Sequence, residues 1–357
     1  MHISTFGSIE IHENVTLAPY TTFRIGGPAR RFCTVTSEAA LQVVLGIAEE
    51  NEWKHFILGG GSNLLVADSG FDGLVIQVAI DAPIRTARLE EEVLVYAPAG
   101  LDWNALVLQM CEQGISGVEC LAGIPGLVGG SPIQNIGAYG QEVADTIHGV
   151  SAYDLETRKF VDLSHADCAF AYRTSLFNST QRDRYVVTSV TFRFDRNAKP
   201  NLTYADLKNH FASSTTPPTP LDIYHAVREI RHAKGMLLVE GEQDCRSAGS
   251  FFKNPIVPTA TLANIATALN LPAEKIPNWP TNPGFTKLPA AWLLDQAGFH
   301  KGFILGNAGI SLRHTLALIN RGQASAADIV LLRDTIQQEV AARFGIYLEQ
   351  EPVQLGF

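Results

Sequence analysis

The segment from residue 121 to residue 140, LAGIPGLVGGSPIQNIGAYG, limits the possible folds more than any other part of this chain. Positions 123–140 hold six glycines and no charged side chain. Glycine adopts positive φ and lets the main chain approach a ligand closely. The apolar side chains that we expect to line this surface are Ile124, Leu127, Val128, Ile133 and Ile136. The segment therefore predicts a wall for a flat, partly apolar cofactor; the alternative is a buried crossing between packed layers.

A second glycine-rich motif, GGGSN at residues 59–63, lies between strand-like runs at 55–58 and 64–67. Successive glycines can turn their N–H groups inward as a nest, which binds phosphate oxygens without a lysine. The motif is not a Walker A loop, since it lacks Gly-Lys-Ser/Thr, and not a Rossmann fingerprint, since a strand follows it rather than a helix. We interpret it as a pyrophosphate cradle, and a plain hairpin turn is the alternative.

Length and charge narrow the class of protein. The chain has 357 residues, enough for two or three domains, and its 46% hydrophobic content supports real cores. The 27 basic and 36 acidic residues give a formal net charge of −9, and no cluster of Lys or Arg resembles a nucleic-acid-binding surface. The N-terminus lacks the layout of a signal peptide, and no run of about 18 apolar residues is present. We therefore expect a cytoplasmic protein that binds neither nucleic acid nor membranes.

The spacing of cysteines and histidines predicts no metal site. The five cysteines are scattered singly without a CxxC pair, and the ten histidines show no HExxH motif. We interpret the cysteines as ordinary small core residues. Any redox chemistry would therefore need an organic cofactor.

Hydrophobic periodicity predicts a mixture of strands and helices. Strand-like runs include residues 74–79, 92–97, 149–154, 159–163, 185–194 and 346–353. Helix-like runs begin at Ser37, Trp103 and Thr219, and others cover residues 259–269, 288–297 and 325–344. Ser325 and Asp328 form a predicted capping box, with Gly345 as the stop. Residues 197–220, rich in Asn, Ser, Thr and Pro, predict a domain junction.

The stretch SAGSFFKNP at residues 247–255 combines several hydrogen-bonding side chains in a tight turn. Ser250 lies beside two aromatic residues, a lysine and an asparagine, which suits a polar ligand. No GxSxG elbow is present, so a hydrolase nucleophile is disfavoured. In the predicted final strand, Glu349 and Glu351 share a face because strand side chains alternate. Solvated surface acids are the alternative interpretation of this pair.

Several single residues have simple structural interpretations when taken alone. Arg173 follows an aromatic-rich run, and a surface ion pair would explain it. Tyr204, in LTYADL, would be a packing residue. Arg231 and Lys234 lie near the end of a predicted helix, where cations stabilise the helix dipole.

Seven motifs nevertheless occur in the order found in UDP-N-acetylenolpyruvoylglucosamine reductases, the MurB family, and the chain resembles that family over nearly its whole length. They are YTTFRIGGPA, LGGGSN, AGIPGLVGGSPIQNIGAYG, FAYRTS, LTYADL, SAGSFFKNP and LEQEP. The resemblance implies an α+β fold: an FAD-binding domain of the vanillyl-alcohol-oxidase type in two subdomains, then a smaller α+β substrate-binding domain. We expect the FAD-binding subdomains at 1–78 and 79–218, the substrate domain at 219–345, and a C-terminal strand at 346–357 that holds Glu351.

The resemblance also implies an activity. NADPH would reduce a non-covalently bound FAD, which would then reduce the enolpyruvyl ether of a UDP-sugar to a lactyl ether, giving UDP-N-acetylmuramate for peptidoglycan. Hydride adds to C3 of the enolpyruvyl group, negative charge develops toward the substrate carboxylate, and C2 then needs a proton. By similarity, Ser250 donates this proton, while Arg173 and Glu351 act at the carboxylate. We expect a monomer.

Further site residues follow from the resemblance. The implied cofactor contacts are Gly59, Gly60, Gly61, Ser62, Asn63, Pro125, Gly129, Gly130, Ser131 and Ile136. The implied substrate contacts are Tyr139, Tyr172, Tyr204, Lys234 and Asn254. In one subgroup of the family, the tyrosine that Tyr204 resembles closes over the substrate diphosphate. Two stretches depart from the family pattern: residues 235–246, which follow Lys234, and LEQEP, where the choice of Glu351 over Glu349 rests on register.

Other functions remain open at this point. A flavin oxidase of the same fold would use oxygen; many such enzymes attach flavin through a His or Cys, and neither lies in the glycine-rich loops. A non-catalytic protein that binds a nucleotide sugar would need neither Ser250 nor Glu351.

Overall fold

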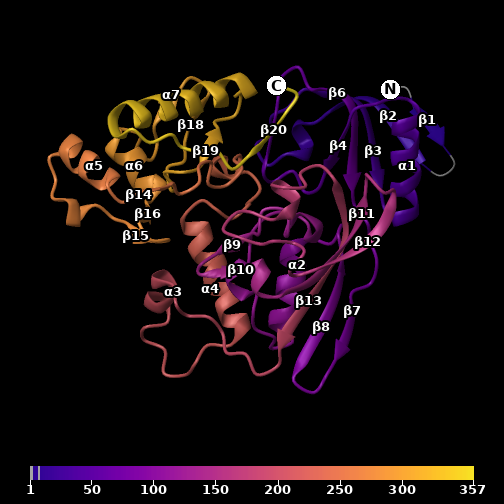
Figure 1. Ribbon diagram of the computed structural model, residues 1–357, viewed down its shortest axis with the longest axis horizontal. Coiled ribbons are helices and arrows are strands. Elements are labelled where there is room, and N and C mark those ends of the chain that lie inside the picture. Colours follow the sequence, from indigo (N-terminus) through magenta and orange to yellow (C-terminus); the bar gives the residue numbers. More distant parts are fainter. Residues whose placement is uncertain (1–2, 7–8) are drawn as a thin grey trace. The chain divides into compact units, whose positions relative to one another are not determined.

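The computed structural model describes residues 3–6 and 9–357 (Figure 1). The chain packs into two compact units. Unit 1 consists of Met1–Val15, Ala29–Gly60 and Asp72–His232, and unit 2 consists of Thr16–Pro28, Gly61–Phe71 and Ala233–Phe357. Both units contain helices and strands, which confirms the predicted α+β class. The consecutive ranges 1–78, 79–218, 219–345 and 346–357 are not tested by this division and stay a prediction.

One sheet of unit 1 has the strand order β1-β2-β3-β6-β4. Strands β4 and β6 run parallel, whereas β1 and β2 are antiparallel. Helix α1 packs on this sheet, because its buried Leu41 and Val44 share a hydrophobic cluster with Val35 and Leu74. The elements are β1 (Ile3–Phe6), β2 (Ile9–Thr16), β3 (Pro28–Val35), α1 (Glu38–Glu50), β4 (His55–Leu58) and β6 (Phe71–Val78).

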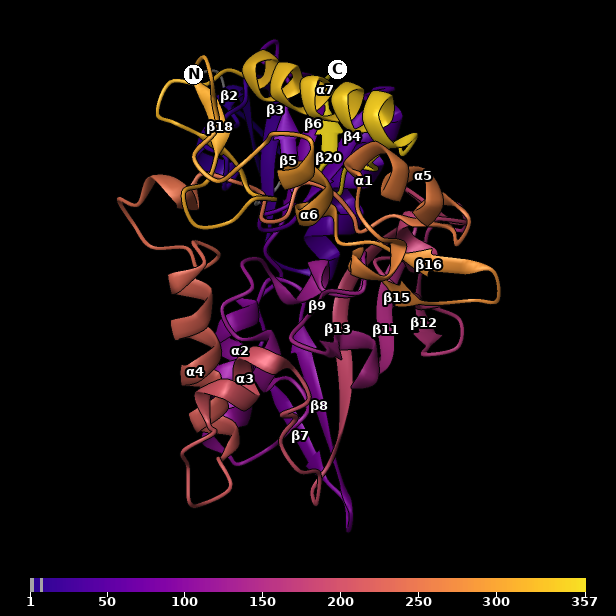
Figure 2. The same ribbon diagram turned by 90° about the vertical axis from the view of Figure 1, so that its left-hand side faces the viewer.

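The other large sheet of unit 1 is antiparallel, in the order β12-β11-β13-β8-β7. Helices α2 and α4 lie side by side next to it (Figures 1 and 2), and the Asn104 amide donates to the Tyr224 hydroxyl between them at 2.9 Å. The strands of this sheet are β7 (Arg85–Arg88), β8 (Glu92–Pro98), β11 (Ile147–Asp154), β12 (Lys159–Ser164) and β13 (Tyr185–Asp195), whereas the short strands β9 (Gly137–Ala138) and β10 (Gln141–Glu142) pair with each other in a separate sheet. The helices are α2 (Trp103–Glu112), α3 (Ala205–His210) and α4 (Pro220–Ala233).

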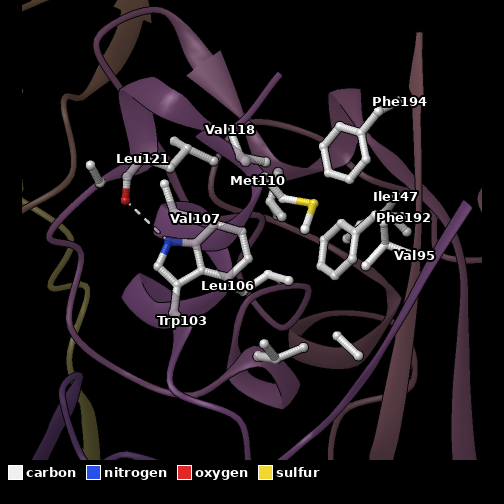
Figure 3. Packing of buried hydrophobic residues seen from close by; sticks show 14 of the residues in the cluster. Val95, Trp103, Leu106, Val107, Met110, Val118, Leu121, Ile147, Phe192 and Phe194 are labelled. Atoms are coloured by element: carbon white, nitrogen blue, oxygen red, sulfur yellow. Dashed lines mark hydrogen bonds between the residues drawn. The ribbon is translucent and has the colours of Figure 1, made fainter. Parts of the chain in front are cut away.

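Trp103 connects this core to the glycine-rich segment. Its side chain is almost fully buried, and the centroid of its ring lies 6.0 Å from the ring centroid of Phe192. The indole N–H donates to the carbonyl of Leu121 at 3.1 Å, so its polar atom is satisfied inside the core (Figure 3). Helix α2 thereby fixes the point from which the glycine-rich segment starts.

Unit 2 contains small sheets and helices around a separate core. Strand β5 pairs with β20 in parallel, and the other sheets have the orders β14-β16-β15 and β17-β18-β19. Buried side chains of α6 and α7, such as Leu293 and Ile336, pack with Phe251 and Phe252. The strands are β5 (Leu64–Val66), β14 (Ile256–Pro258), β15 (Trp279–Pro280), β16 (Phe285–Lys287), β17 (Ile304–Leu305), β18 (Ala308–Ile310), β19 (Leu318–Asn320) and β20 (Val353–Leu355). The helices are α5 (Thr261–Leu269), α6 (Ala290–Gln296) and α7 (Ala326–Phe344).

Local signals predicted the helix ends well. Ser325 and Asp328 form the capping box of α7, and Gly345 ends that helix at φ 70°. The Thr219 hydroxyl accepts from the N–H of Asp222 at 3.2 Å, so α4 begins where the sequence indicates.

The predicted final strand at 346–353 is wrong. Residues 346–349 form no strand, Gln350 makes an isolated bridge with Phe252, and β20 begins only at Val353. The Gln337 side chain of α7 donates to the carbonyl of Leu348 at 2.7 Å. The backbone groups of this segment therefore form hydrogen bonds with one side chain and with single backbone partners. The continuous strand-to-strand hydrogen bonding that the sequence predicted is absent from these described residues.

Within residues 3–6 and 9–357, no helix has the length and hydropathy needed to cross a membrane. The same residues contain no group of three or more His, Cys, Asp or Glu side chains arranged to hold a metal ion. The cysteines are free and buried. Burial raises the pKa of each thiol, as expected for unreactive core residues.

An ion pair with a buried carboxylate joins Asp154, at the end of β11, to Arg184, the residue before β13. Asp154, which is 2% exposed, accepts from Arg184 Nε at 3.0 Å and from Nη2 at 2.8 Å. These hydrogen bonds hold the pKa of the Asp154 carboxyl well below its ordinary value of 3.8. A carboxyl whose pKa is lower in the folded state stabilises the fold above its unfolded pKa, and this contribution is lost as the pH falls below that value.

We therefore expect Asp154→Asn to lower the free energy of unfolding by about 1 to 3 kcal/mol at neutral pH, because Arg184 loses its buried carboxylate partner and keeps only the exposed Glu156, 3.0 Å from its Nη1. The difference from wild type should narrow as the pH is lowered from about 5 to about 2, since the carboxyl of the unfolded wild-type chain then becomes protonated while that of the folded protein stays charged. Urea unfolding across this range measures both effects. A difference that is the same at every pH would contradict the assignment.

Candidate active site

The glycine-rich segment turns tightly beside the end of β8. The 3₁₀ helix η3 (Val128–Gly130) lies there, and the N–H of Gly129 donates to the carbonyl of Ala99 at 2.9 Å. A Cβ at Gly129 would lie 2.6 Å from the Cβ of Ala99, so only glycine fits without a shift. Gly130 is exposed, and apart from its neighbours in the chain no described residue comes within 4 Å of the position that its Cβ would take. The turn therefore packs one side on unit 1 and presents bare main chain on the other.

The glycine motif at residues 59–63 meets this segment within unit 1. A Cβ at Gly60 would lie 2.8 Å from the Cα of Gly126, so main chain packs on main chain. The alternative of a hairpin turn is wrong, because β4 pairs with β6 and β5 pairs with β20. Gly59 is half-buried and Gly60 is exposed. Both glycine-rich stretches thus contribute backbone to the same part of unit 1.

The rest of this motif belongs to unit 2. Gly61 has φ 62°, and its Cβ would lie 1.8 Å from the carbonyl oxygen of Tyr20. The carbonyl of Ser62 accepts from the Thr22 hydroxyl at 3.4 Å. The Asn63 amide donates to the carbonyl of Glu351 at 3.1 Å. Asn63, predicted only as a cofactor contact, therefore also anchors a candidate catalytic residue.

The apolar side chains of the glycine-rich segment face the core more than the sequence suggested. Val128 is fully buried, and the half-buried Ile124, Ile133 and Ile136 pack against the cluster that contains Trp103. The main chain consequently supplies more of the open surface than these side chains do. Of the other predicted cofactor contacts, Pro125 is half-buried, and the buried Ser131 hydroxyl donates to the carbonyl of Val128 at 2.7 Å.

Arg173 lies in a tight turn held against the glycine-rich segment. Ala171 and Thr174 exchange backbone hydrogen bonds of 2.9 and 3.0 Å, and Arg173 between them has φ 53°. Its guanidinium donates to the carbonyls of Gly137 at 2.8 Å and Asn135 at 3.4 Å. The side chain is half-buried against this backbone, which does not fit the interpretation as a simple surface ion pair. Tyr172, 37% exposed, lies beside it in the turn.

Asn135 positions that turn, and the sequence analysis missed it. Its side chain is 1% exposed and donates to the carbonyl of Ala171 at 3.1 Å and to the carboxylate of Glu142 at 2.7 Å. Its Oδ1 accepts from the N–H of Ala144 at 3.1 Å. The available signal was a pair of neighbouring amide side chains, Gln134 and Asn135, inside an uncharged segment, because an amide needs several partners when it is buried.

Tyr139 and Tyr204 meet edge to face in unit 1. Their ring centroids lie 5.3 Å apart at an interplanar angle of 86°. Burial raises the pKa of the Tyr139 hydroxyl to about 12, so this group remains a protonated donor at neutral pH. Tyr204 is 45% exposed just before α3, so it can reach a ligand, and its ring contact makes it more than an isolated packing residue.

Arg231 lies in the last turn of α4 but is 7% exposed, so interaction with the helix dipole does not account for it alone. Burial lowers the pKa of its guanidinium below the ordinary value of 12.5, and the positive charges of Arg173 and Arg228 act in the same direction. The Tyr139 hydroxyl has the opposite effect on this pKa. Cationic and hydroxyl groups therefore gather in this part of unit 1, an arrangement suited to an anionic ligand.

In unit 2, Ser250 and Glu351 are brought to neighbouring positions by backbone pairing. The N–H of Glu351 donates to the carbonyl of Phe251 at 2.8 Å, and the N–H of Lys253 donates to the carbonyl of Glu349 at 2.9 Å. Phe251 and its neighbour in sequence, Phe252, are buried in the core of unit 2 and fix this pairing. Both Ser250 and Glu351 remain half-exposed.

The two terminal acids have different surroundings. Glu349 has a side chain that is 70% exposed and forms an ion pair with Lys253, with 2.5 Å between Oε1 and Nζ. Glu351 is half-buried, and its backbone is bonded on both sides, to Phe251 and to Asn63. These surroundings favour Glu351 over Glu349 as the site carboxylate.

The other predicted substrate contacts of unit 2 lie at chain turns. The Oδ1 of Asn254 accepts from the N–H of Ala290 at 2.9 Å, at the start of α6. Lys234 is half-buried and follows α4 directly. The atypical residues 235–246 are ordered by Arg313, which forms ion pairs with Glu242 and, at 2.7 Å, with Asp244.

The predicted site residues thus form a group in each unit. Unit 1 brings together Arg173, Tyr172 and the glycine-rich segment, and also Tyr139 and Tyr204. Unit 2 brings Ser250 next to Glu351, with Asn63 bonded to Glu351. The structure describes these two groups separately, so the assignment of all of these residues to one site stays a prediction.

Comparisons with known protein families find matches in both the N-terminal and the C-terminal parts of the chain. A family model described as an FAD binding domain matches residues 29–164. Another, the C-terminal domain of UDP-N-acetylenolpyruvoylglucosamine reductase, matches residues 241–355.

Curated relatives named UDP-N-acetylenolpyruvoylglucosamine reductase match over almost the full length. The protein from Thermobifida fusca is 44% identical over 350 residues, which cover 96% of this chain and 97% of the relative. The protein from Neisseria meningitidis serogroup A is 40% identical, covering 96% of both chains. A crystal structure of UDP-N-acetylenolpyruvylglucosamine reductase from Thermus caldophilus is 27% identical with a TM-score of 0.64, covering 99% of this chain and 100% of that one.

Two neighbouring glycines test the geometry of the turn. Gly129→Ala should lower the free energy of unfolding by about 1 to 3 kcal/mol, because the new Cβ overlaps Ala99. Gly130→Ala, the matched control, should change it by less than about 0.5 kcal/mol, since its Cβ would enter open space. Denaturant unfolding of the purified variants measures both, and equal losses would contradict the described packing.

Proposed function

Because the chain belongs to the family of UDP-N-acetylenolpyruvoylglucosamine reductases, we propose that it uses NADPH and FAD to reduce the enolpyruvyl ether of UDP-N-acetylglucosamine enolpyruvate. The product would be UDP-N-acetylmuramate, a precursor of peptidoglycan. The observation that carries the proposal is the pairing that sets Glu351 opposite Phe251, next to Ser250. This pairing brings the backbone of Ser250 close to that of Glu351 from a distant part of the sequence, which supports a site that uses both a hydroxyl and a carboxylate.

The glycine-rich backbone fits an extended dinucleotide cofactor. Main chain packs on main chain at Gly60 and Gly126, and the open side of Gly130 leaves room for a ligand. These stretches would hold FAD without covalent attachment, with the N–H groups of residues 59–63 at the pyrophosphate. Bound FAD would supply the redox chemistry by passing hydride from NADPH to the substrate alkene. The contacts proposed for Ser62, Asn63, Pro125, Ser131 and Ile136 belong to the same arrangement.

The side chains proposed as catalytic would stabilise the negative charge that develops on the substrate and supply a proton to it. Ser250 would donate a proton to C2 of the substrate once hydride has reached C3. Arg173 and Glu351 would act at the substrate carboxylate, toward which negative charge develops. The hydrogen bonds from the Arg173 guanidinium to backbone carbonyls preorganise it, because they fix its plane before the substrate arrives.

The remaining polar residues suit the sugar nucleotide. We propose that Tyr204, Lys234 and Asn254 bind the diphosphate region and that Tyr139 and Tyr172 also contact the substrate. Support comes from the partly exposed ring of Tyr204, the protonated hydroxyl of Tyr139 and the cationic surroundings of Arg231. We further propose a monomeric, cytoplasmic enzyme.

Purified protein distinguishes this proposal from the alternatives. A reductase should be yellow, release free FAD on denaturation, and consume NADPH only when the enolpyruvyl sugar nucleotide is added. Steady oxygen consumption without that substrate would indicate an oxidase instead. A colourless protein that binds the sugar nucleotide without turnover would indicate a binding module.

Ser250→Ala should leave reduction of the flavin by NADPH unchanged and slow its reoxidation by substrate about 10²- to 10⁴-fold, because proton donation belongs only to the second half-reaction. Stopped-flow absorbance separates the two half-reactions. The exposed Ser69→Ala provides a matched control that should affect neither. Equal slowing of both halves would reject the role of proton donor.

Tyr204→Phe should raise KM for the sugar nucleotide about tenfold with unchanged flavin content, since one hydrogen bond to a charged group is lost. Steady-state kinetics at saturating NADPH measures the effect. Tyr347→Phe makes the same chemical change at a residue that is 72% exposed and should leave KM unaltered. If Tyr204→Phe binds substrate as tightly as wild type, the diphosphate contact is wrong.

A further inference from the structure

Unit 1 contains a fully buried carboxylate that the proposed chemistry does not use. Glu119 begins the 3₁₀ helix η2 (Glu119–Leu121), and its exposure is 0%. A buried carboxylate destabilises a protein unless hydrogen bonds replace its lost hydration. The partners of Glu119 therefore indicate why an acid is placed there.

Those partners come from different segments of unit 1. Oε2 accepts from the N–H of Gly117 at 2.6 Å. Oε1 accepts from Gln141 Nε2 at 3.1 Å and from the N–H of Asn201 at 3.0 Å. Gln141 is itself fixed, because its Oε1 accepts from the N–H of Cys120 at 2.9 Å. One side chain thus joins the turn after α2, the strand β10 and the start of the loop that leads to Tyr204.

Asn201 extends this connection in both directions. Its amide donates to the carbonyl of Gly140 at 3.2 Å, next to Tyr139. Its Oδ1 accepts from the N–H of Thr203 at 2.9 Å and from the Thr203 hydroxyl at 2.7 Å. Thr203 immediately precedes Tyr204. The bonds from Glu119 to Asn201 and from Asn201 to Thr203 therefore set the position from which Tyr204 reaches the ring of Tyr139.

We propose that Glu119 is a positioning residue whose buried carboxylate holds Tyr204 against Tyr139 in the arrangement that binds the substrate diphosphate. This inference rests on the proposed function, in which Tyr204 contacts that diphosphate. A carboxylate is required because each of its oxygens accepts from an N–H group. An amide at position 119 would turn an NH₂ group toward one of these donors and leave that N–H without its acceptor.

The test variant is Glu119→Gln, which keeps the size of the side chain and removes one acceptor. It should raise KM for the enolpyruvyl sugar nucleotide about tenfold. Flavin content and the rate of flavin reduction by NADPH should stay at wild-type values, because the Tyr204 loop has no part in that half-reaction. Glu112→Gln makes the same change of charge on the exposed side of α2 and should alter none of these quantities. An unchanged KM in Glu119→Gln would overturn the inference.

A double-mutant cycle with Tyr204→Phe shows whether Glu119 acts through Tyr204. If it does, Tyr204→Phe should raise KM in the wild-type background and add less than about twofold in the Glu119→Gln background. Fully additive effects would overturn the role of Glu119 while leaving the Tyr204 contact in place. No effect of Tyr204→Phe in the wild-type background would instead contradict the Tyr204 contact, and this inference with it.

Asn201→Ala keeps the test decisive if Glu119→Gln folds poorly. It removes the side-chain hydrogen bonds of Asn201 with Gly140 and Thr203. It keeps the backbone N–H of residue 201, which donates a hydrogen bond to Glu119. The carboxylate therefore retains its partners, and the thermal unfolding midpoint should change little. KM should rise in the same direction as in Glu119→Gln, with flavin reduction by NADPH unaffected. A wild-type KM in Asn201→Ala would overturn the inference.

Discussion

Close contact between stretches of main chain is the constraint on which the candidate site depends. Gly60 meets Gly126, and Gly129 meets Ala99, at distances that exclude a side chain. Because this backbone is packed on one side only, it can remain rigid and still present an open surface at Gly130. The glycine-rich segment then serves as the reference for other groups, since the guanidinium of Arg173 binds its carbonyls and Tyr139 lies within it.

The two units fix their candidate side chains by different physical means. Unit 1 uses buried polar groups with several partners, Asn135 for the turn of Arg173 and Glu119 for the loop of Tyr204. Such groups are costly when unsatisfied, so they allow few alternative arrangements. Unit 2 uses backbone pairing anchored by two buried aromatic residues, Phe251 and Phe252. Both solutions keep the supporting atoms buried and leave the candidate ligand-binding atoms partly exposed.

Structural features that depend on residues close in sequence were predicted correctly. Features that depend on contacts between distant segments were predicted wrongly or missed. The caps at Ser325 and Thr219 were correct because their partners lie within one turn. The hairpin alternative at 59–63 and the final strand at 346–353 were wrong because pairing with β6, β20 and residue 252 settles them. Glu119 and Asn135 were missed for the same reason: their partners come from segments that only the fold brings together.

The bond from Asn63 to Glu351 spans 288 positions of sequence. Contacts of such separation close slowly, because the intervening chain must be ordered first. Strand β5, at residues 64–66, likewise pairs with β20, at residues 353–355, so it cannot form this pairing until the later residues have been synthesised. During synthesis on the ribosome, Glu351 could therefore take its position only after residues 351–355 had emerged, and the carboxylate proposed for catalysis would be missing until then.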